Sequence, residues 1–492
     1  MPSEQELVDL RREKREALLA HGDPYPATIG RTHEIARARA LFERNEGEGL
    51  EETRRALTVA GRVIAVRDMG RAAFVDVRDG TGSVQLHLRR NVLGDDFALL
   101  PLIDLGDFVE ARGRLFRTRH GEITVAVRSW RVIAKALRPP PEKWHGLSDV
   151  ETRYRQRELD LIANERSREI ARTRARVVAS VRRFFERRGF MEVETPVLQD
   201  RAGGAAARPF STHHNALDRE LALRIALELH LKRLMIGGFD KVYEIGRVFR
   251  NEGISHRHNP EFTLLESYEA YADYHDVARM VEDLVRSVVS DVTGALEVPH
   301  GEEVVDLGAP WGRTTYREAL LEHTGIDYLQ HPEPEQMRAL ARARGVAVDE
   351  GTSWGTALDG LMSAYVEPHL VQPTFIFDYP AELSPLAKRK RDDPRLVERF
   401  ELFALGYEVA NAYSEQNDPV EQRRRLLEQT TIAGEGDDEV EVADEAFVRA
   451  LEYGMPPAGG LGIGIERLVM LVTGEHSIRE VILFPTMREP GG

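Results

Sequence analysis

The hydrophobic pattern of the chain changes at about residue 50. Before that point apolar residues recur at helical spacing, as at Leu7 and Leu10, which predicts an N-terminal helical extension over residues 1–50. Residues 51–140 instead alternate apolar and polar positions in short runs, such as Val84–Leu88, separated by glycine turns. Four or five such runs in this segment predict a small β-barrel.

Residues 141–492 mix helical and extended patterns after a stiff proline linker at Pro139–Pro141. Ser167–Arg188 has apolar residues at helical spacing and is followed by a glycine, which predicts a long helix. Later segments alternate between strands and helices without the regular order of a parallel βαβ sheet. A helical stretch near residues 327–366 looks inserted, and the acidic run Gly434–Glu439 predicts a solvated loop.

The composition is that of an ordinary globular protein, with 42% hydrophobic and 30% charged residues. No run reaches the roughly 18 apolar residues that a membrane span needs, and the first residues contain no signal-peptide pattern. The absence of cysteine excludes disulfides, a thiol nucleophile and cysteine-bound zinc. A cytoplasmic protein with no membrane contact is expected.

The net charge of −15 would by itself argue against a nucleic-acid partner, but the charge is unevenly distributed. Residues 54–138 hold 16 Lys and Arg against 9 Asp and Glu. A basic module on an acidic body indicates a localised binding surface for a polyanion.

The segment from Phe249 to Phe262 reads as a strand, a loop and a second strand. Because strand side chains alternate between faces, Phe262, Glu266 and Tyr268 share one face, which combines an aromatic plate with groups able to bind a cation. The loop holds donors suited to a polyphosphate, namely Arg250, Arg257 and His258. An exposed hairpin with incidental charges is the structural alternative.

Glycines at alternate positions mark a second segment, Gly459–Arg467. Gly460, Gly462 and Gly464 share one strand face, so a flat ligand could approach the backbone there, although tight helix–sheet packing would explain the glycines as well. The spacing differs from that of a dinucleotide-binding loop, and Arg467 begins a helix.

A third segment, Phe400–Glu415, is rich in carboxylates. Glu401 and Glu408 are of the type that binds Mg²⁺, with solvated acids as the alternative. Asn411, Tyr413 and Glu415 share a strand face, and Glu408 is out of phase with them, so all can face one way only if the strand contains a bulge.

In the basic module Phe74 falls on the polar face of a strand whose Val75 and Val77 face the core. Gln85 lies on the polar face of the next strand. An aromatic ring in this setting is a candidate platform for stacking a nucleic-acid base, although a single exposed Phe is common.

Taken in order, these segments resemble the three signature motifs of class II aminoacyl-tRNA synthetases, and most closely those of the bacterial-type lysyl-tRNA synthetases. Gly189–Pro196 resembles motif 1, Arg250–Phe262 motif 2 and Gly460–Arg467 motif 3. Further matches are Gly203–Phe210, Thr212–Asp218 and Ile482–Pro485.

The resemblance implies an α+β fold in which an antiparallel catalytic sheet with flanking helices, residues 141–492, follows an OB-fold anticodon-binding domain at residues 51–140. It implies a homodimer built through motif 1. It also implies the ATP-dependent ligation of L-lysine to tRNA(Lys) through lysyl-adenylate, with release of pyrophosphate and AMP.

For ATP, the resemblance implies that Arg250 contacts the α-phosphate and that His258 meets the terminal phosphate, with Arg467 as the third catalytic residue. Phe262 and Arg467 would enclose the adenine ring, and Mg²⁺ would be bound by two glutamates. The implied ATP set is Arg250, Glu252, His258, Asn259, Phe262, Glu401, Glu408 and Arg467, with Glu401 and Glu408 as the metal ligands.

For lysine, the resemblance implies carboxylates around both amino groups and Arg250 at the carboxylate. The implied set is Gly204, Glu228, Arg250, Glu266, Tyr268, Asn411, Tyr413 and Glu415. The residues matching those that read the central anticodon base are Arg67, Phe74, Gln85 and Glu122. The chain departs from the commoner family pattern at Ala412, Tyr413 and Glu466.

Three other functions fit parts of this pattern. An aspartyl- or asparaginyl-tRNA synthetase shares the architecture, but Glu266 and Glu415 would repel aspartate. A lysyltransferase acting on a protein would not need a barrel with Phe74 and Gln85. A noncatalytic RNA-binding relative would not need Arg250 together with the paired glutamates.

Overall fold

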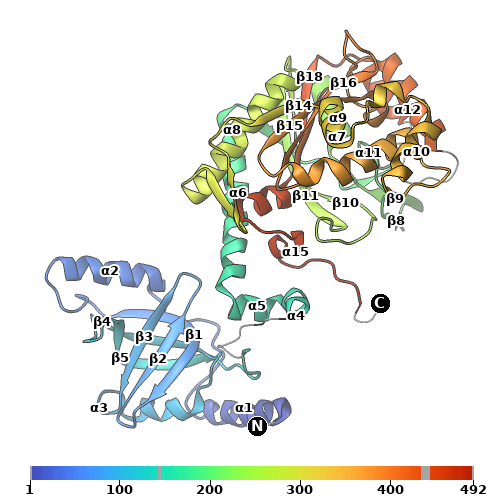
Figure 1. Ribbon diagram of the computed structural model, residues 1–492. Helices are drawn as coiled ribbons and strands as arrows, with labels where there is room; N and C mark the ends of the chain where they lie inside the picture. The colour runs from blue at the N-terminus through green and yellow to red at the C-terminus, as the bar shows by residue number, and fades with distance from the viewer. Residues whose placement is uncertain (1–2, 142–146, 148, 434–443, 490–492) are drawn as a thin grey trace. The chain divides into compact units, whose positions relative to one another are not determined.

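The computed structural model of the protein consists of two compact units, residues 1–148 and 149–492 (Figure 1). The structure describes residues 3–141, 147, 149–433 and 444–489. The loop predicted at 434–439 lies outside the described residues. Among the helices that the structure describes, none is long and apolar enough to cross a membrane.

The N-terminal unit is a closed five-stranded barrel with helices packed against it. Its elements are α1 (Glu4–Leu19), α2 (Ile35–Gly47), β1 (Leu57–Asp68), β2 (Ala72–Arg78), β3 (Ser83–Arg89), α3 (Arg90–Leu93), η1 (Gly94–Leu102), β4 (Phe108–Arg117) and β5 (Ile123–Ala134). The strand order is β1-β2-β3-β5-β4, with only β3 and β5 parallel. Val75, Val77 and Leu86 fill the barrel, while Ile35 and Phe42 of α2 are fully buried in the same core. The predicted barrel is confirmed.

The C-terminal unit is built on an eight-stranded sheet. In spatial order its strands are β14 (Gly312–Thr315), β15 (Thr374–Pro380), β16 (Leu396–Ala404), β17 (Tyr407–Ser414), β18 (Ala458–Gly464), β11 (Glu261–Ala270), β10 (Lys241–Phe249) and β6 (Met191–Glu192). Neighbours are antiparallel except for the two edge pairs, β14–β15 and β10–β6. The expected antiparallel sheet with flanking helices is confirmed.

The helices of this unit surround the sheet. They are α4 (Val150–Arg155), α5 (Arg157–Ala163), α6 (Glu165–Arg187), α7 (Glu228–Ile236), α8 (Tyr274–Thr293), α9 (Tyr316–Thr324), α10 (Pro334–Ala343), α11 (Trp354–Tyr365), α12 (Pro419–Ala433), α13 (Glu445–Leu451), α14 (Ile465–Thr473) and α15 (Ile478–Val481). Short elements complete it: β7 (Leu198–Gln199), β8 (Ser211–His214), β9 (Arg219–Leu223), β12 (Glu297–His300), β13 (Glu303–Asp306), η2 (Tyr328–Gln330), η3 (Glu367–His369) and η4 (Ala381–Leu383).

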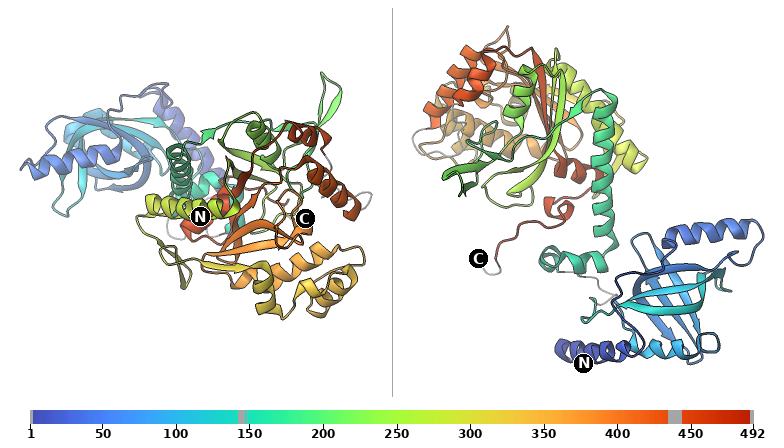
Figure 2. Two further views of the ribbon diagram at one scale, coloured as in Figure 1. Left: turned by 90° about the horizontal axis from the view of Figure 1, so that it is seen from above. Right: turned by 180° about the vertical axis from the view of Figure 1, so that it is seen from behind.

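One face of the sheet is covered by α6, α8 and α14, which bury a continuous apolar core. α8 starts at a capping box formed by Asp273 and Asp276, and its buried Val281, Leu284 and Val288 recur at helical spacing. α6 and α8 lie side by side in Figure 1 and in the reverse view of Figure 2. This covered face gives the sheet a rigid back.

The opposite face is covered by apolar side chains only at its two ends. α7 and α13 pack over β10 and β11, where Leu231 and Phe447 are fully buried. α9, α10 and α11 pack at the β15 and β16 end, where Tyr316 and Leu361 are fully buried. The helical stretch at 327–366 therefore forms part of the second cover. Between the two covers the strands present polar side chains.

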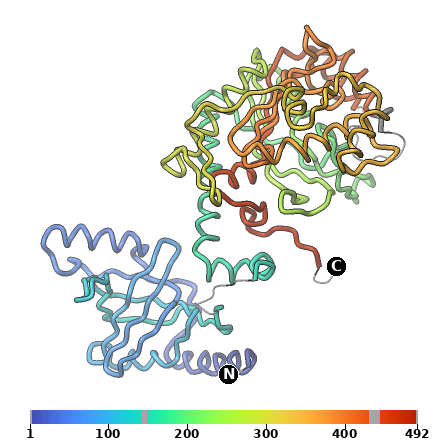
Figure 3. Tube along the Cα trace, in the orientation of Figure 1, coloured from blue at the N-terminus to red at the C-terminus, as the bar shows by residue number. Residues whose placement is uncertain are grey.

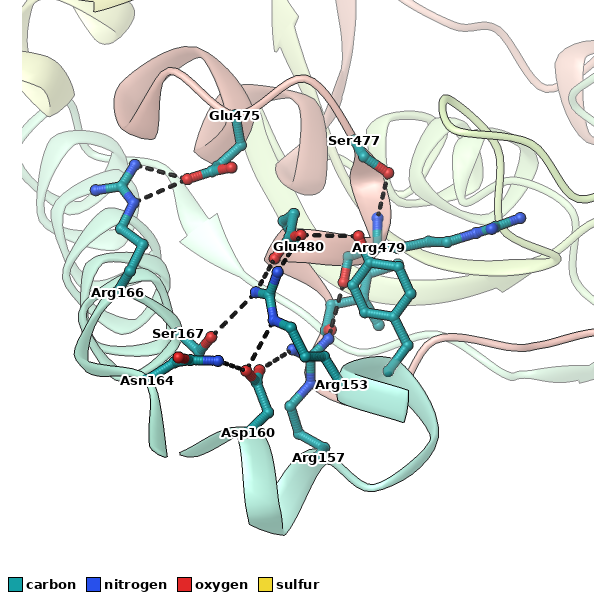
Figure 4. Close-up of polar contacts among 12 residues, drawn as sticks. Arg153, Arg157, Asp160, Asn164, Arg166, Ser167, Glu475, Ser477, Arg479 and Glu480 are labelled. Atoms are coloured by element: carbon teal, nitrogen blue, oxygen red, sulfur yellow. Dashed lines mark hydrogen bonds and ion pairs between the residues drawn. The ribbon is translucent and has the colours of Figure 1, made fainter. Parts of the chain in front are cut away.

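A buried ion network attaches the C-terminal end to the start of this unit (Figure 4). Arg157 is 2% exposed and pairs with Asp160 at 2.6 Å. Its guanidinium also donates to the carbonyls of Arg479, Ile482 and Leu483. Arg153 bridges Asp160 and Glu480, at 2.9 Å each. Figure 3 shows this last segment of the chain, in red, returning beside α6.

The network also fixes a loop of the uncovered face, because the N–H of Ile478 in α15 donates to the carbonyl of His256 at 2.8 Å. His256 belongs to the loop that carries Arg257 and His258.

We expect Arg157→Met to lower the free energy of unfolding of the C-terminal unit by about 3–5 kcal/mol, because the buried Asp160 keeps only one of its two arginine partners and three backbone carbonyls lose their donor. The matched control is Arg166→Met, which breaks an ion pair with Glu475 in which the arginine side chain is 56% exposed, and which should cost less than about 1 kcal/mol. Urea unfolding of both variants measures the difference. Equal losses would contradict a special role of the buried arginine.

Candidate active site and nucleic-acid interface

A cavity of about 960 Å³ opens between the two covers of the polar face. It is lined by β11, β16, β17 and β18, by the start of α7 and by the loop between β10 and β11. Every residue predicted for ATP or lysine lines it: Gly204, Glu228, Arg250, Glu252, His258, Asn259, Phe262, Glu266, Tyr268, Glu401, Glu408, Asn411, Tyr413, Glu415 and Arg467. Residues spread over more than 260 positions of sequence thus meet in one hollow.

Three carboxylates, those of Glu228, Glu266 and Glu415, are buried in the wall of this cavity. Glu266 accepts hydrogen bonds from the N–H of Leu227 at 2.9 Å and from the Tyr268 hydroxyl at 3.0 Å. Burial, with Glu228 nearby, raises the pKa of Glu266 to about 8. Three buried carboxylates that share one cavity suit a ligand that carries positive charge.

Glu415 fits into the wall only because residue 460 is glycine. A Cβ at Gly460 would lie 1.8 Å from Oε1 of Glu415 and 2.7 Å from the Tyr268 ring. A Cβ at Gly462 would meet no heavy atom closer than the Asn411 carbonyl oxygen at 3.8 Å. Of the two glycines, Gly460 makes room for a carboxylate of the protein itself, and the backbone of Gly462 is left open to the cavity.

Gly204 is required for a different reason. Its φ of +88° lies in the left-handed region, and a Cβ there would press on Cβ of Glu228 at 3.1 Å. The glycine lets the chain pass closely over the start of α7, where Glu228 lies.

The cationic groups of the cavity are Arg250, Arg257, Arg399 and Arg467, and His258 lies among them. Burial lowers the pKa of Arg250, whose guanidinium carbon lies 5.2 Å from the centre of the Phe262 ring. Burial and then Arg467, Arg257 and Arg250 lower the pKa of His258. A polyanion bound here would offset this concentration of positive charge.

Glu401 and Glu408 line the same cavity because β17 contains the bulge that the pattern requires. The pairing of β16 with β17 shifts register between Leu402 and Phe403, which brings Glu408 to the side of Asn411. Burial raises the pKa of Glu401 to about 7, an effect that Arg399 opposes and Glu408 reinforces. Arg467 pairs with Glu408 at 3.0 Å.

Among the described residues, no group of three or more His, Cys, Asp or Glu could hold a metal ion by itself. Mg²⁺ commonly binds through one or two carboxylates together with substrate phosphates, so Glu401 and Glu408 would be sufficient protein ligands for it. A bound cation would relieve their mutual repulsion.

Arg399 is a cavity residue that sequence reasoning missed. Its side chain is 12% exposed, pairs with Glu401, and donates to Asn411 Oδ1 at 3.1 Å and to Ser384 Oγ at 2.6 Å. Asn411 in turn donates to the Tyr413 hydroxyl at 3.0 Å. The signal available in the sequence was spacing, because Arg399 and Glu401 are two residues apart in one strand and so share a face.

Among the residues predicted for ATP, Asn259 is bound within the protein through both ends of its side-chain amide. Asn259 donates to the carbonyl of Glu261 and accepts from the N–H of Thr486, so its side chain holds the loop in place. Glu252 is exposed at the cavity wall. Glu466, a departure from the family pattern, accepts from Arg174 and from the N–H of Thr263 and so joins α14 to α6 and β11.

The four residues predicted to contact the anticodon lie together on one face of the barrel. Arg67 is paired with Phe74 across β1 and β2, and Thr124 donates to the side chain of Gln85 and the carbonyl of Glu122. Asp76, which shares the polar strand face of Phe74 but is not in the predicted anticodon set, accepts from both Arg67 and Gln85.

His87 is a further member of this face. Its ring stacks on Phe74, with centroids 4.7 Å apart and planes 9° apart, and lies 6.3 Å from Phe116. His87 therefore covers one face of the Phe74 ring, and a base could stack on the opposite face. The signal available in the sequence was the position of His87, two residues after Gln85 on the same strand face.

Comparison with known proteins defines the class to which this site belongs. The family described as tRNA synthetases class II (D, K and N) matches residues 149–488, and the family described as OB-fold nucleic acid binding domain matches residues 57–133. The two matches fall on the two units of the structure.

Full-length relatives narrow the identification. The chain is 51% identical to a lysine–tRNA ligase of Dehalococcoides mccartyi over 97% of both chains. It is 50% identical to that of Carboxydothermus hydrogenoformans over 98% of both, and 49% identical to that of Moorella thermoacetica over 99% of both. The chain therefore belongs to the lysine–tRNA ligase family of class II tRNA synthetases.

We expect Gly460→Ala to lower the free energy of unfolding by about 1–3 kcal/mol, because the added methyl group displaces the buried Glu415. Gly462→Ala, two residues along the same strand, should change it by less than about 0.5 kcal/mol, because its Cβ meets open space. Urea unfolding monitored by circular dichroism compares them. A loss at Gly462 as large as that at Gly460 would contradict this view of the wall.

Proposed function

We propose that this enzyme joins L-lysine to tRNA(Lys) through a lysyl-adenylate, releasing first pyrophosphate and then AMP. The observation that supports lysine as the amino acid is that three buried carboxylates line the same cavity as Arg250. The matched family includes synthetases for aspartate, lysine and asparagine. A cavity wall with three carboxylates attracts an ammonium group and repels the side chain of aspartate. The activity for which the relatives are named agrees with this choice.

In the first step the lysine carboxylate attacks the α-phosphorus of ATP in line, and the bond to pyrophosphate breaks. No protein nucleophile is required, so the enzyme contributes positioning and charge stabilisation. Arg250 would contact both the carboxylate and the α-phosphate, and His258 and Arg467 the outer phosphates. Phe262 and Arg467 would enclose the adenine ring.

Glu401 and Glu408 would hold Mg²⁺, whose charge would neutralise the phosphate oxygens as pyrophosphate departs. Arg399 would keep Glu401 oriented through the ion pair between them. Arg467, which pairs with Glu408 at 3.0 Å, would exchange that partner for the nucleotide.

In the second step a hydroxyl of the terminal adenosine of the tRNA attacks the carbonyl of the adenylate, and AMP leaves. The barrel would select the tRNA by stacking an anticodon base on Phe74 and hydrogen bonding it through Arg67 and Gln85. Glu122 would complete this set.

Selection of lysine follows from the cost of buried charge. A neutral amino acid would leave buried carboxylates without a partner at a cost of about 3–5 kcal/mol, a discrimination of roughly 10²–10³-fold or more. A side chain shorter by one methylene would be penalised by only about 1–3 kcal/mol.

We also infer a homodimer and a cytoplasmic setting, in line with the family. Close to the motif 1 match, Met191, Val197 and Leu198 are 38–47% exposed in the single chain. Apolar side chains exposed together suit a subunit interface.

Lysine alone among the proteinogenic amino acids should support ATP–pyrophosphate exchange. We expect Glu415→Gln to raise the KM for lysine by about 100-fold or more and to leave the KM for ATP nearly unchanged, because Glu415 faces the amine and not the nucleotide. The control is Glu269→Gln on the same strand as Glu266, since Glu269 pairs with Lys241 outside the cavity. Unaltered lysine kinetics in Glu415→Gln would refute the assignment.

Phe74→Ala should weaken tRNA binding by about 5- to 150-fold, because stacking contributes about 1–3 kcal/mol per base. Exchange of pyrophosphate in the absence of tRNA should not change. Met69→Ala serves as the control, since Met69 is 66% exposed on the same unit. Filter binding of the tRNA measures both. An unchanged affinity in Phe74→Ala would contradict the proposal that tRNA binds to this face of the barrel.

A further inference from the structure

A buried amine stands directly behind the three carboxylates of the cavity. Nζ of Lys232 lies 2.5 Å from Oε1 of Glu228 and 2.5 Å from Oε2 of Glu415. The Lys232 side chain is completely buried, and Lys232 is not among the residues that line the cavity. It belongs to α7, one turn after Glu228, and its position places it where the substrate cannot reach.

A second buried lysine shows what a purely structural arrangement looks like. Lys135 in the barrel also lies between two carboxylates, Asp104 at 2.5 Å and Asp107 at 2.8 Å. The remaining contacts of Asp107 are backbone N–H groups, those of Asp104 and Ala136, so that network is closed. The carboxylates that pair with Lys232, those of Glu228 and Glu415, instead form part of a cavity wall. Oε1 of Glu415 has no hydrogen-bond partner among the described residues.

The formal charges explain why an amine is needed at this place. Glu228, Glu266 and Glu415 supply three negative charges, and Lys232 and Arg250 supply two positive ones. The set therefore carries −1 when all its members are ionised. Lysine with two ammonium groups and one carboxylate carries +1, so the bound complex is neutral. Without Lys232 the same complex would hold one uncompensated negative charge in a buried site.

We propose that Lys232 is a positioning and specificity-determining residue, which neutralises one carboxylate of the wall and holds Glu228 and Glu415 in place for a ligand of net charge +1. This inference rests on the proposed function. Lys232 does not touch the substrate; it acts through the two glutamates that do.

The other groups that face Lys232 and its partners are consistent with this role. Tyr268 and Tyr413 line the same wall, Arg250 supplies the second positive charge, and the Phe447 ring lies 5.9 Å from Nζ of Lys232. Burial lowers the pKa of Lys232, but the pairs with Glu228 and Glu415 outweigh it and raise that pKa. The amine therefore stays charged throughout the range in which the enzyme can be assayed.

The test uses the full-length enzyme in ATP–pyrophosphate exchange, beginning with the unaltered protein. Exchange with lysine in that protein checks the proposed function, and its absence would count against the function and not against Lys232 alone. Lys232→Met keeps the length of the side chain and removes its charge. The matched control is Lys390→Met, which breaks a half-buried pair with Asp378 in the same unit, 2.7 Å long and outside the cavity.

For Lys232→Met we expect a KM for lysine raised by about 100-fold and a KM for ATP within about twofold of the original. The dication 1,5-diaminopentane should gain as an inhibitor relative to lysine by about tenfold or more, because the altered wall carries −2. If Lys232 had a purely structural role, lysine and 1,5-diaminopentane would lose affinity to the same extent, and that result would overturn the proposal.

Lys232→Ala provides a second route if the methionine variant folds poorly. The space left by the removed atoms matches propylammonium, which should restore part of the exchange rate at millimolar concentration in this variant and in no other. An equal response in Lys390→Met, or restoration by uncharged propanol, would contradict the need for a positive charge.

Discussion

The site depends on keeping a buried group of charges close to neutral. Glu415 is 1% exposed and Glu266 is 5% exposed, and unpaired carboxylates in such places are costly. Two fixed cations, Lys232 and Arg250, cancel two of the three negative charges. One proton on the pair Glu266 and Glu415 cancels the remainder in the free enzyme, since burial raises the pKa of each carboxyl to about 8. Binding of lysine would displace that proton, because the net positive charge of lysine neutralises the same carboxylate.

The backbone makes this arrangement possible. β11 and β17 flank β18, so their side chains reach the cavity from either side of a strand of glycines. Gly460 accommodates the Glu415 carboxylate, and the bulge in β17 brings Glu408 to the cavity beside Asn411. The covered back of the sheet holds these strands rigid, which keeps charged groups apart at fixed spacing. Arg250 lies between the two halves of the site, beside both the carboxylates and the phosphate donors.

Local patterns in the sequence predicted much of the site, because strand alternation is a local property. Glu266 and Tyr268 were placed on one face by their spacing, and the barrel was predicted from the short alternating runs. The order of the eight strands depends on distant pairings that no local pattern contains. The row of glycines fits either an approaching ligand or tight packing, and the structure contains both, because Glu415 and Tyr268 fill the space at Gly460 and Gly462 is open to the cavity. Lys232 and Arg399 were missed because a charged residue on a helix or strand ordinarily faces solvent.

Proton release on lysine binding tests the electrostatic account most directly. Isothermal titration of lysine into the enzyme at pH 7, in two buffers of different ionisation enthalpy, counts the protons exchanged. A carboxyl with a pKa near 8 is mostly protonated at pH 7, so the account predicts release of about one proton per lysine bound, falling toward zero as the pH rises past that pKa. Binding with no proton exchange at pH 7, or with uptake of protons, would contradict it.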